Sequence, residues 1–221
     1  MNGMPWQLVT IDIDGTLTTV HGWRVIAERA GRLAEYAETN RAFLAGDIGE
    51  DEHLRDLLEI AVGLPNHEFE TALSITPRIA GIDGFVRKLH DEGVRVVLLT
   101  HNPTLVCEWY QRTFGFDDFA GVPGSAVEGG RLGALPPVRA DKVAGLKELL
   151  GRLSVAPNRV VHIGDGWADA RVFPRVGGGV ALNSAWPEVR RAADLALDLE
   201  DLRPLAERLR SLHPREHVND A

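Results

Sequence analysis

The sequence predicts an α/β protein: a Rossmann-like parallel sheet with helices on both faces, interrupted by a small helical cap. Two observations predict this class. Short apolar and β-branched runs, each followed by a helical pattern, recur at 8–13, 94–99 and 160–163. Between the first two runs, residues 19–81 show helical periodicity without a strand pattern. We therefore expect a core made of 1–18 and 82–221, with 19–81 as the cap.

The first run, Leu8 to Ile13, reads as a buried strand that ends where Gly15 allows the chain to turn. Asp12 and Asp14 stand at its carboxyl end, the edge at which open α/β sheets bind ligands. One carboxylate can attack a ligand there while the other handles a proton. Taken alone, the two aspartates are also compatible with a purely structural role at the strand end, in which Asp14 only begins an Asx-turn.

Helical spacing of apolar residues predicts the elements of the cap. One set runs over 25–37 and a second over 54–61. A shorter set at 69–73 follows the breaker Leu64-Pro65-Asn66. These three sets predict three helices.

The strand-helix alternation resumes at Gly81, with a helix over 85–90 and then the strand over 94–99. That strand stops at Thr100-His101-Asn102-Pro103. Asn102 is a good N-cap and Pro103 a good first helical residue, so we expect a helix to begin there. The Thr100 hydroxyl and free amides at a helix N-terminus would form an anion site.

The remaining elements follow in the same way. Residues 126–132 predict a hairpin around a Gly-Gly turn, and 140–153 an amphipathic helix with Lys142 in its first turn. Cations favour the other end of a helix, so an anionic partner would explain Lys142, although a solvated lysine is a common alternative. The later elements are a strand over 160–163 ending in Gly164-Asp165-Gly166-Trp167-Ala168-Asp169, strands at 179–182 and 193–197, and a closing helix at 202–212.

Composition excludes several classes of function. The net charge of −8, with Lys and Arg scattered along the 221 residues, argues against a nucleic-acid or anionic-membrane partner. The single cysteine, Cys107, rules out an internal disulfide and fits a reducing compartment. No apolar run approaches the roughly 18 to 20 residues of a membrane span, and Met1 to Gln7 is too short and polar for a signal peptide. We expect a cytoplasmic monomer or homodimer.

The order of the polar positions resembles the haloacid dehalogenase (HAD) superfamily over nearly the whole chain. The motifs are DxDGT at 12–16, an apolar strand ending in Thr100, a helix-borne Lys142, and GDGxxD at 164–169. The resemblance implies a magnesium-dependent phosphatase that hydrolyses a small-molecule phosphomonoester through an aspartyl-phosphate intermediate. A small phosphorylated metabolite is then the expected partner.

The resemblance also implies a role for each matching residue. Asp12 would be the nucleophile, Asp14 the general acid and base, and Lys142 the cation that offsets the charge on Asp12 and the phosphoryl group. Asp12, the carbonyl of Asp14 and Asp165 would hold Mg²⁺. Asp169 would orient Lys142 or a metal-bound water. The phosphate would be bound by Thr100, His101, Asn102 and Gly15.

Within the superfamily, the position of the helical insertion resembles the phosphoserine phosphatase-like branch. Ala45-Gly46, Thr76-Pro77 and the hairpin at 128–132 support this resemblance. The sequence departs from this family at positions that would bind the substrate. The family's acid that binds the serine amine aligns at or near His21, and its arginine that binds the serine carboxylate aligns near Leu57. The family's Ser-Gly-Gly phosphate loop is Thr100-His101-Asn102 here, and its usual Asn before the last aspartate is Ala168.

Several residues are therefore candidates for a different substrate surface on the cap. His21, Trp23 and Arg24 directly follow the catalytic loop, and Arg55 would restore one contact if the register shifts. Each is equally compatible with ordinary packing or solvation. The alternatives left by the sequence are phosphoserine phosphatase proper and a catalytically idle binding module on the HAD fold. A dehalogenase needs only one aspartate in the first motif, and Asp14 argues against it.

Overall fold

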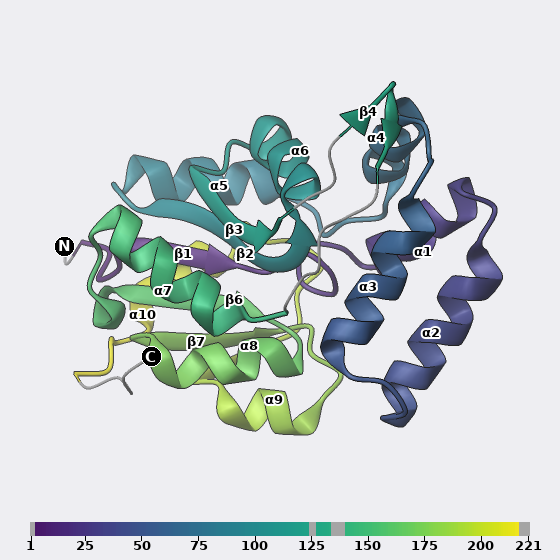
Figure 1. The fold of residues 1–221 in the computed structure, drawn as a ribbon. Coiled ribbons are helices and arrows are strands. Elements are labelled where there is room, and N and C mark those ends of the chain that lie inside the picture. Colours follow the sequence, from purple (N-terminus) through teal and green to yellow (C-terminus); the bar gives the residue numbers. More distant parts are fainter. Residues whose placement is uncertain (1–2, 124–126, 134–139, 217–221) are drawn as a thin grey trace.

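The computed structural model describes residues 3–123, 127–133 and 140–216 (Figure 1). Within these residues its core is a parallel sheet with the strand order β3-β2-β1-β6-β7-β8, which confirms the predicted fold class. The strands are β1 (Leu8–Ile11), β2 (Arg95–Pro103), β3 (Asp118–Val122), β6 (Val160–Gly164), β7 (Gly178–Leu182) and β8 (Leu195–Leu197). The short strand β3 had no clear signal in the sequence, because its residues are mostly half-buried.

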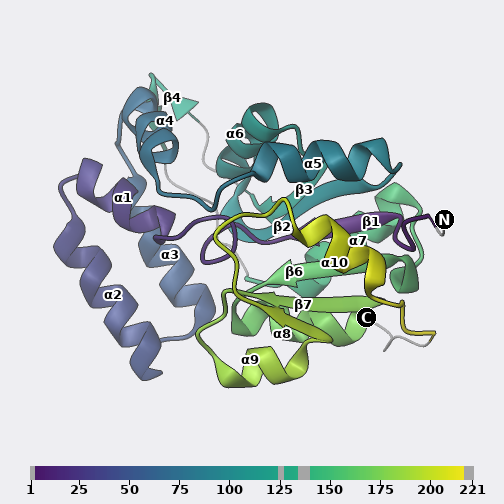
Figure 2. The same cartoon turned by 180° about the vertical axis from the view of Figure 1, so that it is seen from behind.

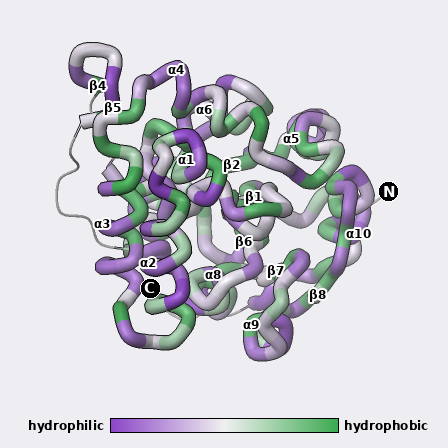
Figure 3. Tube along the Cα trace, turned by 90° about the vertical axis from the view of Figure 1, so that its right-hand side faces the viewer, coloured by the Kyte–Doolittle hydropathy of each residue, from purple (hydrophilic) through white to green (hydrophobic). Residues whose placement is uncertain are grey.

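Helices cover both faces of the sheet (Figures 1 and 2). They are α5 (Ile82–Asp91), α6 (Thr104–Phe114) and α10 (Leu205–Ser211) on one face, and α7 (Lys142–Leu153), α8 (Trp167–Val172) and α9 (Pro187–Ala192) on the other. Alternate strand residues point to opposite faces. Val9 accordingly packs in one apolar cluster with α5 and α10, while Leu8 packs in another with α7. Figure 3 shows hydrophobic and hydrophilic residues alternating along the helices.

Strand order places the ligand edge between β1 and β6. The chain proceeds from β1 outward to β2 and β3, then returns to the other side of β1 to form β6. Such a switch point opens a crevice at the carboxyl ends of the strands. Ile11 is paired with Leu98 on one side and Ile163 on the other, so the three strands reach this edge in register.

The cap consists of α1 (Gly22–Arg29), α2 (Leu33–Ala45), α3 (Glu50–Ala61) and α4 (Asn66–Ile75). The prediction of one helix over 25–37 was wrong, because the chain breaks between α1 and α2. Gly31 has a φ of +70°, a left-handed conformation that ends α1. Leu33 is 40 % exposed, so its helical spacing did not mark a buried face. The described helices include none that is long and apolar enough to cross a bilayer.

Two linkers join the cap to the core, and they run side by side. Thr18 and Arg78 form an antiparallel bridge. The amide of Thr19 donates to the carbonyl of Pro77 at 3.0 Å, and that of Ile79 to Leu17 at 3.0 Å. The connection therefore behaves as a short two-stranded ribbon rather than two independent loops.

The predicted hairpin is confirmed as β4 (Val127–Glu128) paired with β5 (Arg131–Leu132), whereas Ala126 lies outside the described residues. Its position was not foreseen. The hairpin lies against the turn between α3 and α4, where the amide of Gly63 donates to the Leu132 carbonyl at 2.7 Å and that of Leu132 donates to Leu64 at 3.0 Å. A segment of the core sequence is thus attached to the cap.

One prediction at the ligand edge was wrong. Strand β2 continues through Pro103 and α6 begins at Thr104, so Asn102 is not an N-cap and Pro103 is not helical. The physical reason is that the Asn102 side chain is already bonded to Asp14, Thr100 and Trp23. Helix α6 therefore begins one residue later than predicted, and Thr100, His101 and Asn102 belong to the end of β2.

Candidate active site

Asp12, Lys142 and Asp169 form a buried charged chain at the carboxyl ends of β1 and β6. The Nζ atom of Lys142 lies 2.9 Å from Asp12 Oδ1 and 2.6 Å from Asp169 Oδ1. All three residues are buried, at 7 % exposure or less. Lys142 is the first residue of α7, and Asp141 before it caps the helix by accepting from the amide of Ala144. The anionic partner that would explain a lysine in a first turn is therefore present.

Asp169 is fixed by four donors and has no oxygen left unpaired. Its Oδ1 accepts from Lys142 and from His162 Nε2 at 2.9 Å. Its Oδ2 accepts from the amides of Gly166 at 2.9 Å and Asp165 at 3.2 Å. A carboxylate used in this way positions its neighbours rather than binding a ligand itself.

His162 extends this chain into the sheet, and sequence reasoning missed it. It lies in the middle of β6, is fully buried, and its Nδ1 is 2.9 Å from Thr10 Oγ1. Because Nε2 meets a carboxylate, this nitrogen carries a proton and donates it. The signal was a lone polar residue within the apolar run 160–163.

Burial and charge act in opposite directions on these groups. Burial alone would lower the pKa of Lys142, but the Asp12 and Asp169 carboxylates outweigh it and raise this pKa. Burial would raise the pKa of Asp169, but Lys142 and His162 hold it well below its usual range. Burial raises the pKa of Asp12 despite the nearby ammonium. Lys142 and Asp169 are therefore ionised at neutral pH.

Asp165 completes the carboxylate cluster from the loop after β6. Its Oδ1 accepts from the Thr16 hydroxyl at 2.9 Å, and its carbonyl accepts from the Ser184 hydroxyl at 2.6 Å. Gly15, with a φ of +83°, is required here: a Cβ would lie 2.3 Å from Asp165 Oδ2. Burial, followed by the charges of Asp169 and Asp12, raises the pKa of Asp165 well above its ordinary value.

These carboxylates fit a divalent cation. Among the described residues, Asp12, Asp165 and Asp169 bring ligand oxygens within 4.8 Å of one another. Asp169 is saturated with donors, so Asp12 and Asp165 are the two that can ligate. Three clustered carboxylates face a single lysine, and carboxylate oxygens are the ligands that Mg²⁺ prefers. The donor set therefore suits the predicted ion.

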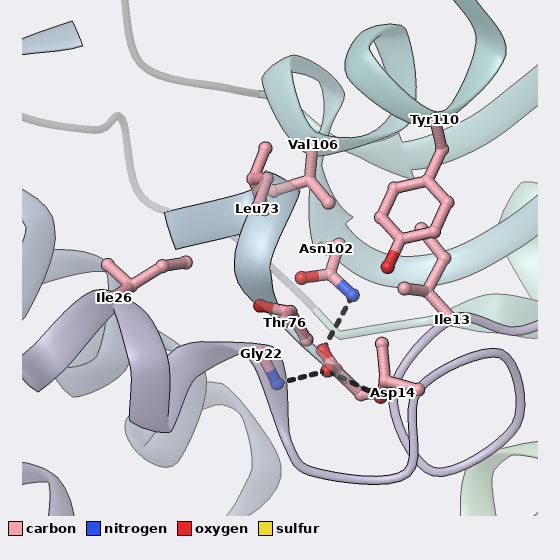
Figure 4. Close-up of a pocket in the computed structure, with 10 residues that line it drawn as sticks. Ile13, Asp14, Gly22, Ile26, Leu73, Thr76, Asn102, Val106 and Tyr110 are labelled. Atoms are coloured by element: carbon pink, nitrogen blue, oxygen red, sulfur yellow. Dashed lines mark hydrogen bonds between the residues drawn. The ribbon is translucent and has the colours of Figure 1, made fainter. Parts of the chain in front are cut away.

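Asp14 points away from this cluster, toward the start of the cap. Its Oδ1 accepts from the Gly22 amide at 2.6 Å and from the Thr18 hydroxyl at 3.4 Å, and its Oδ2 accepts from Asn102 Nδ2 at 2.9 Å (Figure 4). The two aspartates of the motif thus have different surroundings. Asp12 belongs to the charged chain, and Asp14 to the joint between core and cap.

Thr100 and His101 close the other side of the site. The Thr100 hydroxyl oxygen accepts from both the amide and the side-chain Nδ2 of Asn102, which leaves its own proton free to be donated to a ligand. Burial, then the charge of Lys142, lowers the pKa of His101 to about 4, so its imidazole is neutral. The buried Nε2 of His101 has no protein partner.

A small hollow, partly open to solvent, borders Asp14 at the seam between core and cap. Figure 4 shows its largely apolar lining, with Ile26 and Leu73 contributed by the cap and Val106 and Tyr110 by α6. Asp14 is the only ionisable carboxylate on its wall.

The cap candidates are separated by the structure. Trp23 is 3 % exposed and donates its indole N–H to Asn102 Oδ1 at 3.0 Å. His21 lies beside Tyr36, with ring centroids 6.0 Å apart, and its buried Nδ1 has no partner. Arg24 is exposed, and Arg55 pairs with Glu52 at 3.5 Å on the surface. The structure brings neither arginine into the site.

Comparisons with known proteins agree with this geometry. A model of the haloacid dehalogenase-like hydrolase family matches residues 6–177. The phosphoserine phosphatase of Halobacterium salinarum is 29 % identical over 188 residues, which cover 80 % of this chain and 85 % of that protein. The phosphoserine phosphatase of Archaeoglobus fulgidus is 26 % identical over 204 residues, 90 % of this chain but only 59 % of that protein.

Solved structures show the same fold. A HAD family hydrolase from Salmonella enterica superposes with a TM-score of 0.83 at 16 % identity, over 97 % of this chain and 74 % of that chain. A substrate-bound phosphoserine phosphatase superposes with a TM-score of 0.78 at 20 % identity, over 92 % of this chain and 98 % of that chain. Because the family model spans the strands and loops that carry the buried carboxylates, the chain belongs to the haloacid dehalogenase-like hydrolases.

Proposed function

We propose that this hydrolase is a magnesium-dependent phosphatase that cleaves a small-molecule phosphomonoester through an aspartyl-phosphate on Asp12. One observation carries the proposal. Lys142, fixed by Asp169, places its ammonium 2.9 Å from Asp12 Oδ1, next to a second ligating carboxylate at Asp165. A nucleophilic carboxylate needs such a cation, because the transferred phosphoryl group brings further negative charge.

In the first step, a carboxylate oxygen of Asp12 attacks phosphorus and the bond from phosphorus to the alcohol oxygen breaks. Protonated Asp14 gives its proton to that leaving oxygen. The Thr100 hydroxyl and Lys142 stabilise the charge on the phosphoryl oxygens.

In the second step, water attacks the phosphorus of the aspartyl-phosphate. Asp14, now a carboxylate, accepts a proton from this water, and Asp12 is released with inorganic phosphate. One carboxyl group therefore serves as acid and then as base, and it is ready for the next cycle.

Asp12, the carbonyl of Asp14 and Asp165 would hold Mg²⁺, with Asp169 positioning Lys142 beside it. When bound, the ion neutralises charge on the substrate phosphate and on the carboxylate cluster. Gly15 keeps the space open for this arrangement, because any side chain there would overlap Asp165.

The substrate is a small phosphomonoester whose alcohol lies under the cap. We propose that residues 19–81 act as a cap that covers the site during the first step and admits water for the second.

Phosphoserine is the second candidate substrate, favoured by the names of the Halobacterium and Archaeoglobus relatives. Against it stand His21 and the buried Leu57, which provide neither an acid for the amine nor a base for the carboxylate. A cytoplasmic location, expected from the lone cysteine, belongs to the same proposal.

The test is hydrolysis of p-nitrophenyl phosphate with and without Mg²⁺, followed by a panel of small phosphorylated metabolites that includes phosphoserine. We expect turnover that requires Mg²⁺ and is lost by at least about a thousand-fold in Asp12→Asn. Circular dichroism should show that the variant stays folded. Near-normal rates in Asp12→Asn would remove this residue from the nucleophile's role, and absent turnover in the folded wild type would favour an idle binding module.

A further inference from the structure

Asn102 lies where the core, the cap and the candidate acid meet. Its side-chain Nδ2 is 2.9 Å from Asp14 Oδ2 and 3.1 Å from Thr100 Oγ1, and its Oδ1 is 3.0 Å from Trp23 Nε1. Figure 4 shows its amide directed at Asp14. The residue is 6 % exposed, so solvent does not compete strongly for these bonds.

The orientation of this amide is determined by its partners. An indole N–H only donates, so the Asn102 oxygen has to face Trp23. The Asn102 nitrogen then faces Asp14 Oδ2, to which it donates. A reversed amide would place oxygen against carboxylate and N–H against N–H. The ring of Trp23 therefore fixes the direction in which Asn102 donates.

Trp23 makes this a connection to the cap. It is the second residue of α1, immediately after Gly22, whose backbone amide donates to the other oxygen of Asp14 at 2.6 Å. Two consecutive cap residues thus hold Asp14, one directly and one through Asn102. Movement of α1 would change both contacts together.

Resting on the proposed function, we infer that Asn102 is a positioning residue for the general acid: it aims Asp14 at the alcohol oxygen and, through Trp23, makes this aim depend on the position of the cap. The step concerned is the first one. The bond from Asp12 to phosphorus forms, the bond from phosphorus to the alcohol breaks, and the Asp14 proton goes to the alcohol oxygen. A misdirected Asp14 slows this transfer when the leaving oxygen is basic.

The test compares two leaving groups. The alcohol of ethyl phosphate needs a proton to leave, whereas p-nitrophenolate leaves without one. In the Mg²⁺-loaded protein, we expect Asn102→Ala to lower kcat/KM, which reports on the steps up to formation of the aspartyl-phosphate, at least about ten-fold more for ethyl phosphate than for p-nitrophenyl phosphate. Asp14→Asn should show the same selectivity in stronger form, and Trp23→Phe, which keeps an aromatic ring but removes the N–H, in weaker form.

Trp6→Phe is the matched control. Trp6 is also buried, at 2 % exposure, and donates its indole N–H at 2.8 Å, but to the Leu209 carbonyl far from the site. This variant should lose stability without changing the ratio between the two substrates. If Asn102→Ala does not fold, the ratio measured for Trp23→Phe against Trp6→Phe decides.

Equal losses of kcat/KM on both substrates would overturn the inference, and equal losses that arise from a rise in KM would make Asn102 a phosphate ligand instead. An unchanged ratio in a folded Trp23→Phe would overturn the connection to the cap. Failure of the proposed function itself looks different, because the wild type would then turn over neither substrate.

Discussion

In the carboxylate cluster of the core the buried polar atoms are hydrogen-bonded, whereas on the face of the cap above it some are not. In the core, Asp169 has four donors and Lys142 has a carboxylate on each side. On the cap, the buried Nδ1 of His21 and Nε2 of His53 have no partner in the described structure. Buried polar atoms without a partner cost about 1–3 kcal/mol each. The comparison teaches that the charged groups of the core cluster are held in place by hydrogen bonds, whereas these two cap histidines are not.

The largest effect should come from Lys142→Ala, which removes the cation from the core cluster. It leaves Asp12 and Asp169 buried and uncompensated, so we expect a loss of about 3–5 kcal/mol in the free energy of unfolding. We also expect kcat to fall at least about a hundred-fold. Denaturant unfolding and steady-state kinetics measure both, with the exposed Lys147→Ala on the same helix as control. A stable and active Lys142→Ala would contradict the preorganised cluster.

The pH dependence of that stability difference follows from the shifted pKa values. The pKa of Lys142 is raised above 10.5, so its contribution is present below that pH and is lost only as pH rises through the folded value. The pKa of Asp169 is lowered, so its contribution is present above 3.8 and is lost as pH falls through the folded value. The stabilisation that Lys142 and Asp169 contribute to the wild type should therefore stay constant from about pH 5 to 9, as measured by denaturant unfolding across this range.

A second effect concerns the ion. Because burial and two neighbouring carboxylates raise the pKa of Asp165, this ligand is protonated at a higher pH than an ordinary aspartate. Mg²⁺ should therefore raise the Tm at pH 7.5, and this stabilisation should shrink strongly by pH 5. Asp165→Asn should abolish the Mg²⁺-dependent shift at both values. A shift that survives the substitution would place the ion elsewhere.

A smaller effect is expected from His162. Substitutions there test whether the hydrogen-bonded network of the core extends beyond Asp169 into the sheet. His162→Leu removes one of the two donors on Asp169 Oδ1, so kcat should fall about ten-fold with little change in KM. His162→Gln retains a donor and should restore part of the loss. Equal kcat in the two variants would make His162 a packing residue only.

The smallest effects should be found at the cap arginines. Arg24 is exposed and Arg55 forms an exposed ion pair with Glu52, a type of contact that contributes about 0–1 kcal/mol. Alanine at either position should change KM by less than about two-fold for any substrate of the wild type. A larger rise in KM would show that the cap recruits these side chains when it binds substrate.

Sequence reasoning predicted the fold and the core of the site because both depend on local patterns. Buried parallel strands are recognisable in the sequence as apolar runs. The polar residues that follow these runs meet because the carboxyl ends of parallel strands lie at the same edge of the sheet. The hydrogen bond between Trp23 and Asn102 could not be predicted, since it depends on how a cap helix meets β2. The break at Gly31 was missed because the exposed Leu33 continued an apolar rhythm by chance. His162 left a signal, but a lone histidine in a strand does not reveal its partner.

The hairpin β4–β5 gives the cap a third point of attachment, remote in sequence from the two paired linkers. Main-chain hydrogen bonds join Leu132 of the hairpin to Gly63 and Leu64 of the cap. A cap that moves away from the carboxylates must therefore either carry the hairpin with it or break these bonds.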